Sequence, residues 1–238
     1  MLTDLADACR KSGLNVIELS GWRTRARPAS TGGFDPRGVL VHHTGGASDT
    51  KEYALWMAAT GRADLPAPLC QLALDRKGTV YVCAAGRANH GGDAKATGPM
   101  PAGDGNALYI GIEAMNDGSE GWAPTQYAAY VALCAALCDH YGWPASHVRA
   151  HRETSLTGKW DPGLLDMDKF RNDIAARLEE DEMNADEIRK IIREEINASK
   201  LDVGRKHEWS EDTVAETLVN RLGRIETLLT KLLEGKGK

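Results

Sequence analysis

Residues 38–46, GVLVHHTGG, are the stretch that decides the fold of this chain. The segment opens with an apolar run, which is typical of a strand buried on both faces of a sheet. It closes with His42 and His43, just before a Thr-Gly-Gly turn. Because adjacent strand residues point to opposite faces, at most one of the two histidines faces a given site. Burying such a polar pair is costly without partners, so this strand end is a candidate functional position.

Four further apolar runs, bounded by Gly, Pro or Asp, predict the other strands of a sheet. They are NVIEL (15–19), LCQLAL (69–74), TVYVC (79–83) and LYIGIEAM (108–115). The sequence DRKG (75–78) predicts a hairpin turn between the middle two runs. Helical spacing predicts helices over 50–60, 124–141 and 166–178, with Pro124 in a first turn. This mixture predicts an α/β fold with a mixed central β-sheet flanked by helices.

The composition excludes several classes of protein. The chain has 238 residues, a net charge of −5 and five cysteines. This charge gives no basic footprint for nucleic acid, and no run of ~18 apolar residues is present to span a membrane. The first residues carry two Asp and no apolar core, so we expect no secretory signal and a cytoplasmic start. An odd number of cysteines without a CxxC pair indicates reduced thiols.

The acidic run EEDEMNADE, which starts at residue 179, marks a change in the character of the chain. We therefore predict a domain over 1–178, an acidic linker over 179–186 and a helical region over 187–238. In the helical region, apolar residues recur on one helical face and then at heptad spacing. This pattern predicts a helical hairpin or a coiled-coil extension. Packing of these helices on each other and self-association into a homo-oligomer fit the spacing equally well.

A second polar cluster lies in VRAHRETSLTGKWDPG, residues 148–163. It holds His151, Lys159 and Asp161 within eleven residues, in a context that reads as a loop. A loop of this kind can fold the lysine and the aspartate back beside the histidine. Two histidines and one aspartate make three protein ligands, the number that a catalytic zinc site typically has. From spacing alone, a metal site and an ordinary loop are equally good interpretations.

Glu113 is a carboxylate on the otherwise apolar run 108–115. On a strand, it shares one face with Gly111, while the isoleucines occupy the other. A charged residue is rarely buried on an apolar strand unless it has a partner or a function. It is either a salt-bridged residue at a strand end or a general base beside a reacting water. The long stretch over 86–107, rich in Gly, Ala and Pro, is the kind of loop that is often functional.

Together, VHHTGG, IGIEAMNDG and AHRETSLTGKWDPG resemble the zinc-dependent N-acetylmuramoyl-L-alanine amidase family, which shares its fold with peptidoglycan-recognition proteins. The motifs occur in the family's order and approximate separation, and the resemblance covers about residues 12–178. The segments VIELSGWRTRARP and GRANHGGDA look especially like endolysins of phages that infect actinobacteria. The resemblance implies hydrolysis of the amide between N-acetylmuramic acid and L-alanine in bacterial peptidoglycan.

The resemblance also implies the site residues. His42, His151 and Asp161 match the ligands of a catalytic Zn²⁺ ion. Glu113 matches the acidic residue that assists the attacking water, and Lys159 matches the residue that stabilises the developing oxyanion.

Three further residues are expected to bind substrate: His90, in the loop that lines the groove of relatives, and His43 and Thr44 beside the first ligand. One departure from the family concerns Cys70, which stands where some members have a catalytic tyrosine. Because a thiol lacks the reach and acidity of a phenol, we expect this chain to depend on Glu113 instead.

Two alternatives to an endolysin follow from the same resemblance. Some proteins of this fold bind peptidoglycan without cutting it because a zinc ligand is missing, whereas here all three ligand positions hold competent residues. Others recycle soluble muropeptides inside the cell. The helical extension and the endolysin-like opening favour a lysin that waits in the host cytoplasm and acts on the wall after release. The region 187–238 is then either an oligomerisation element or a wall-binding module.

Overall fold

The central strand of the structure is β2 (Gly38–His43), and all six of its residues are buried. In this computed structural model, β2 pairs in parallel with β7 (Tyr109–Ala114) on one side and with β8 (Val148–Ala150) on the other. A strand that is paired on both edges and covered on both faces has no side in contact with water. Its sequence is therefore apolar without alternation, and the strand predicted over 38–43 is confirmed.

The central sheet has six strands within the described residues, in the order β1-β4-β3-β7-β2-β8. The three strands on the far side of β7 are β1 (Val16–Glu18), β3 (Leu72–Leu74) and β4 (Val80–Val82). The β3–β4 pair is antiparallel and the other pairs are parallel, so the predicted mixed sheet is confirmed. Strand β3 starts later than predicted. The Gln71 carbonyl accepts both the Cys83 and the Ala84 N–H groups, which interrupts the regular ladder there.

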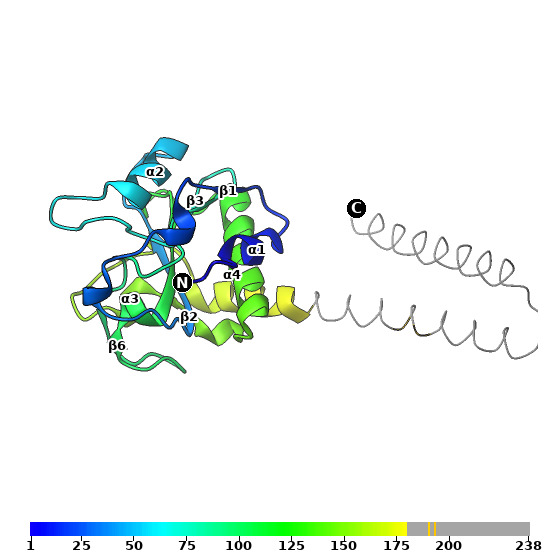
Figure 1. The fold of residues 1–238 in the computed structure, drawn as a ribbon. Helices are drawn as coiled ribbons and strands as arrows, with labels where there is room; N and C mark the ends of the chain where they lie inside the picture. Colours follow the sequence, from blue (N-terminus) through cyan, green and yellow to red (C-terminus); the bar gives the residue numbers. More distant parts are fainter. Residues whose placement is uncertain (180–189, 191–192, 194–238) are drawn as a thin grey trace, which may run out of the picture. The chain divides into compact units, whose positions relative to one another are not determined.

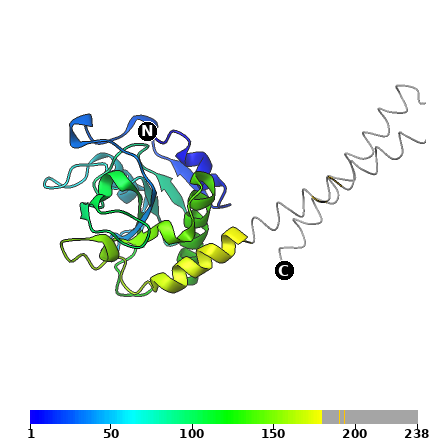
Figure 2. The same cartoon turned by 90° about the horizontal axis from the view of Figure 1, so that it is seen from below.

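Helices cover both faces of this sheet (Figures 1 and 2). Helices α1 (Leu5–Arg10), α4 (Pro124–Tyr141) and a helix over 167–179 pack on one face, around a core that includes Val39 and Val41 of β2. Helix α2 (Lys51–Ala59) packs on the other face. The predicted helices over 50–60, 124–141 and 166–178 are thus confirmed within a residue or two.

The remaining elements are short, and most lie in the connections around the sheet. They are η1 (Trp22–Thr24), η2 (Ala29–Thr31), β5 (Asp93–Ala94), β6 (Gly103–Asp104), α3 (Gly105–Leu108), η3 (Ala145–His147) and α5 (His151–Thr154). Strands β5 and β6 pair with each other within the long loop predicted over 86–107. That loop covers part of the sheet, because its Met100 packs with Leu40 and Tyr109 in a small core of its own.

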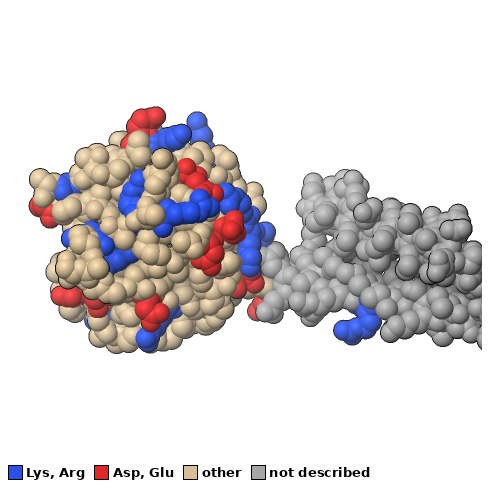
Figure 3. Space-filling view, viewed as in Figure 1, with Lys and Arg blue, Asp and Glu red and all other residues tan. Residues whose placement is uncertain are grey.

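The structure describes residues 1–179, 190 and 193. Residues 1–178 form one compact unit. The predicted linker and the predicted helical hairpin or coiled coil over 187–238 lie outside the described residues, apart from these few positions. Among the described residues, no helix has both the length and the apolar character needed to cross a membrane. On the face drawn in Figure 3, acidic and basic side chains are interspersed.

A buried tyrosine of α4 completes the end of the central strand. The pairing of β2 with β8 covers Val39 to Val41, so His42 lies one residue beyond it. The Tyr130 hydroxyl accepts a hydrogen bond from the His42 N–H at 3.0 Å and donates toward the carbonyls of Ile112 and His42, at 3.1 and 3.2 Å. The fully buried phenol therefore satisfies backbone groups that the ladder leaves open.

We expect Tyr130→Phe to lower the free energy of unfolding by about 1–3 kcal/mol, because the buried His42 N–H loses its acceptor. Urea unfolding followed by circular dichroism measures this change. Tyr127→Phe is the matched control, since Tyr127 is only partly buried and its hydroxyl bonds Asp173 at 2.6 Å. An unchanged midpoint and slope for Tyr130→Phe would contradict the assignment.

Candidate metal centre

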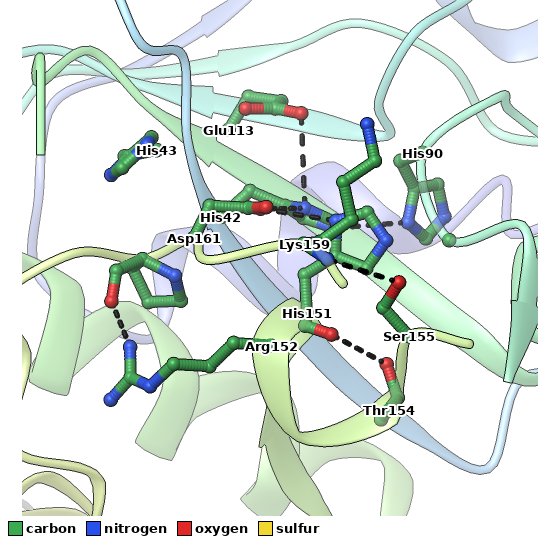
Figure 4. A network of polar contacts seen from close by, with 12 residues as sticks. His42, His43, His90, Glu113, His151, Arg152, Thr154, Ser155, Lys159 and Asp161 are labelled. Carbon is green, nitrogen blue, oxygen red and sulfur yellow. Dashed lines mark hydrogen bonds and ion pairs between the residues drawn. The ribbon is translucent and has the colours of Figure 1, made fainter. Parts of the chain in front are cut away.

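Three potential metal ligands converge where the parallel strands end. His42 lies at the end of β2, His151 directly follows β8, and Asp161 comes from the loop after α5 (Figure 4). Each offers one donor atom, and these atoms all lie within 4.8 Å of one another. All three residues are buried. The predicted His–His–Asp group is therefore confirmed as a group able to hold a metal ion.

The distances within this group suit a small divalent cation. Asp161 Oδ2 lies 2.8 Å from His42 Nδ1 and 3.1 Å from His151 Nδ1. Ligands bound tetrahedrally at about 2.0–2.1 Å from zinc are roughly 3.3 Å apart. Small outward movements of these side chains thus open the space that an ion needs. The donor set of two imidazoles and one carboxylate is also one that zinc accepts.

The protonation states suit metal binding as well. Burial lowers the pKa of His42 to about 4, so this imidazole is neutral near pH 7 and keeps a lone pair for an ion. Burial acts to raise the pKa of Asp161, but hydrogen bonds from His151 and His42 outweigh it and hold that pKa below its usual range. The aspartate is therefore a carboxylate, which is the form that ligates metals.

His90 lies directly behind the first ligand. Its Nδ1 is 3.2 Å from His42 Nε2, and both rings are buried. The His90 ring packs on Gly111 of β7, where a Cβ atom would come within 2.5 Å of the ring. When His42 Nδ1 holds a metal, the His42 proton resides on Nε2 and is donated to His90. Such outer partners fix the tautomer and orientation of a ligating histidine.

Glu113 reaches the same place from β7. It stands opposite His42 in the register of β2 and β7, and its Oε1 lies 4.0 Å from His42 Nδ1. Burial is the largest cause that raises the pKa of Glu113 well above its usual value, and the Asp161 charge adds to it, while Lys159 acts to lower it. The second oxygen, Oε2, is buried without a hydrogen-bond partner. Glu113 is thus a carboxyl group suited to holding a proton.

The loop that carries Asp161 also brings Lys159 to the site. Arg152 of α5 anchors this loop: its N–H donates to the Asp161 carbonyl at 2.8 Å, and its guanidinium donates to the Pro162 and Leu165 carbonyls. The exposed Lys159 side chain lines a cleft of about 480 Å³ together with the three potential ligands and Glu113. Figure 4 shows Lys159 extending past the two ligand histidines. Lys159 thus places an exposed basic side chain at the site.

The other expected substrate-binding residues also line this cleft. Thr44 is half-buried, and its hydroxyl donates to the Asn116 carbonyl at 3.4 Å. His43 is buried, and its Nδ1 accepts a hydrogen bond from the Gly163 N–H at 2.9 Å. His43 therefore helps to hold the loop that carries Asp161, which its position in the sequence did not indicate.

Cys70, which the resemblance places where some members of the family have a tyrosine, is fully buried and does not line the cleft. Aromatic residues that the sequence analysis did not single out do line it: Tyr53 and Trp56 from α2, and Trp160 from the Asp161 loop. The lysine–tryptophan–aspartate order over 159–161 was the available signal for Trp160. No local pattern pointed to the two aromatic residues of α2.

Comparison with known proteins agrees with this site. The N-acetylmuramoyl-L-alanine amidase family, Amidase_2, matches residues 32–164. Among solved structures, the amidase LysC from Clostridium intestinale URNW is 18% identical with a TM-score of 0.50, covering 66% of this chain and 95% of that chain. The Ph2119 endolysin of a Thermus scotoductus MAT2119 bacteriophage is 20% identical with a TM-score of 0.47, covering 67% and 98%. No curated protein matches the sequence.

The fold and the site define an α/β domain with a group able to hold a metal ion, and the similarity to solved structures supports the fold alone. The family match spans more than half of the chain and includes all three potential ligands. The chain therefore belongs to the N-acetylmuramoyl-L-alanine amidase family, and it carries that family's enzyme activity on a His42, His151 and Asp161 metal group.

We expect His90→Ala to weaken metal binding about 10–100-fold, because His42 loses the acceptor that orients its ring. His90→Asn restores much of the affinity, since the amide oxygen stands near the position of Nδ1. Competition of the purified protein with a zinc chelator measures the affinity. His140→Ala, which removes a histidine paired with Asp4 away from the site, is the control. Equal zinc affinity of His90→Ala and the unaltered protein would refute the orienting role.

Proposed function

We propose that this amidase uses zinc and acts as a bacteriophage endolysin that cuts the amide between N-acetylmuramic acid and L-alanine in intact peptidoglycan. The observation that carries the proposal is the convergence of His42, His151 and Asp161 in the floor of one cleft, with Glu113 and Lys159 beside them. Two imidazoles and one carboxylate are three protein ligands, which leaves a fourth, exchangeable position on zinc, as a catalytic site requires.

The residues divide the reaction between them. A bound zinc ion supplies Lewis acidity, which lowers the pKa of water and polarises a carbonyl. Glu113 takes a proton from the attacking water and returns it to the departing L-alanine amine. The raised pKa of Glu113 suits this exchange, because a carboxyl group that holds its proton more tightly is a better base.

Lys159 stabilises the negative charge that develops on the carbonyl oxygen. Its side chain is exposed and lines the cleft, where it can approach the substrate. Charge stabilisation of this kind is often the largest single contribution to catalysis. Asp161 keeps the metal bound, whereas Lys159 acts on the substrate, so their replacements have different consequences.

Action on the wall polymer fits the surface of the site. Lys159 and Trp160 are exposed at the cleft, which gives a bulky chain access to the ligands. The endolysin-like segments VIELSGWRTRARP and GRANHGGDA support a phage origin in which the enzyme waits in the host cytoplasm until it is released. The similarity of the opening to lysins of actinobacterial phages supports that host group.

Digestion of purified peptidoglycan with and without a chelator tests the proposal. We expect new L-alanine amino groups that disappear with the chelator and return with added Zn²⁺, with no increase in reducing sugars. A protein that releases amines only from soluble muropeptides would favour a recycling amidase. Zinc-loaded protein that binds the wall without releasing amines would instead show a binding protein.

We expect Asp161→Ala to lose zinc, and Lys159→Ala to retain zinc but lose about 10²–10³-fold in kcat. Elemental analysis of both purified variants and their rates on peptidoglycan provide the measurement. Lys169→Ala, which removes a surface lysine paired with Asp173, is the control. A zinc-free Lys159→Ala, or an active zinc-loaded Asp161→Ala, would overturn the division of roles.

We expect Glu113→Gln to retain zinc and to lose about 10²–10⁴-fold in kcat, because an amide of the same shape cannot accept the proton. Glu52→Gln, at an exposed position of α2, is the control for the chemical change itself. If Glu113→Gln cut peptidoglycan at the rate of the unaltered enzyme, another group would have to be the base.

A further inference from the structure

Trp160 is a large apolar side chain that is exposed to solvent beside the potential metal ligands. It stands between Lys159 and Asp161 and is 56% exposed, yet it lines the cleft. Tryptophans usually bury most of their surface. An exposed indole at a cleft that already holds a polar site is therefore a candidate contact for substrate.

The indole is fixed rather than free to rotate. Its ring packs edge-on against His43, with centroids 4.3 Å apart. Two glycines lie under it: a Cβ atom at Gly118 would come within 2.7 Å of the indole, and one at Gly163 within 2.4 Å. The Gly163 N–H also donates to His43 Nδ1, which holds the loop and the histidine together. A contact surface that is already ordered loses little entropy when it binds a ligand.

The cleft adjoins a second cavity, and the two have chemically different linings. Trp56 and Tyr53 of α2 stack on each other, with centroids 5.5 Å apart and planes 7° apart, and line the same cavity as Trp160. A second cavity of about 200 Å³ shares five residues with the first: Leu65, Asn89, His90, His151 and Lys159. The residues that line only the second cavity are polar or glycine: Gly91, Gly92, Asp93, Asn106, Ser155 and Thr157. His151 and Lys159 line both cavities, so they lie where an aromatic end of the cleft meets a polar end.

The two halves of the substrate differ in the same way. A pyranose ring presents an apolar face of C–H groups that packs on an aromatic ring, whereas a peptide presents N–H and C=O groups that need polar partners. We infer that Trp160 binds the sugar ring of N-acetylmuramic acid, so that the glycan lies at the aromatic end and the stem peptide at the polar end. This inference rests on the proposed function.

Two soluble substrates with the same scissile amide test the inference. N-acetylmuramoyl-L-alanyl-D-isoglutamine carries the sugar, and D-lactoyl-L-alanyl-D-isoglutamine lacks it. We expect Trp160→Ala to raise KM for the sugar substrate about tenfold, with kcat changed less than twofold, because a contact made equally in the ground and transition states affects KM alone. The lactoyl substrate reacts within twofold of the unaltered enzyme. Trp160→Phe keeps most of the affinity for the sugar substrate.

Leu156→Ala is the matched control, because it removes another exposed apolar side chain of the same loop. The zinc content of Trp160→Ala must equal that of the unaltered protein. Equal losses on both substrates, or a loss of zinc, would mean that Trp160 only positions Lys159 and Asp161 and would overturn the inference. If the unaltered zinc-loaded enzyme cut neither these substrates nor the wall, the proposed function itself would fall.

Discussion

The parallel pairing of β2 between β7 and β8 is the constraint on which the rest of the structure depends. Parallel strands all finish at the same edge of a sheet, so residues far apart in sequence meet there. The register places His42 opposite Glu113, and the pairing of Val41 with Ala150 puts His151 next in line. The pairing of the three strands therefore fixes the positions of His42, Glu113 and His151.

The loops then complete the site by reaching back over this edge. The segment after α5 brings Asp161 back to the histidines. Hydrogen bonds from the Arg152 guanidinium and to the His43 ring hold this segment in place. The long connection before β7 places His90 behind His42, where the absence of a side chain at Gly111 leaves room for the ring. Each loop is thus fixed by a contact with the strand ends, so the ligands are positioned by the sheet rather than by loop conformation alone.

The sequence predicted those parts of the molecule that a local pattern determines. Buried strands read as apolar runs and helices as periodic ones, so the sheet and the main helices followed from GVLVHH and its counterparts. The ligands followed because three short motifs combine in a fixed order. The hydrogen bond between Tyr130 and His42 spans 88 positions of the sequence, and the contact between His90 and His42 spans 48. No local sequence pattern marks such distant pairs. Strand β8 was missed as well, because three residues are too few to show a period.

The cysteine at position 70, where some members of the family have a tyrosine, lies where it cannot take part in the reaction. The thiol is fully buried in the core beneath α2 and cannot meet a substrate. Tyr53 does line the cleft, but it comes from α2 rather than from the segment before β3 that carries Cys70. The Glu113 carboxyl lies 4.0 Å from His42 Nδ1, and its Oε2 is buried with no hydrogen-bond partner. A buried unpaired oxygen is costly to stability. An unpaired oxygen beside a metal group is explained when that oxygen accepts a proton during the reaction, and this is the role that we propose for Glu113.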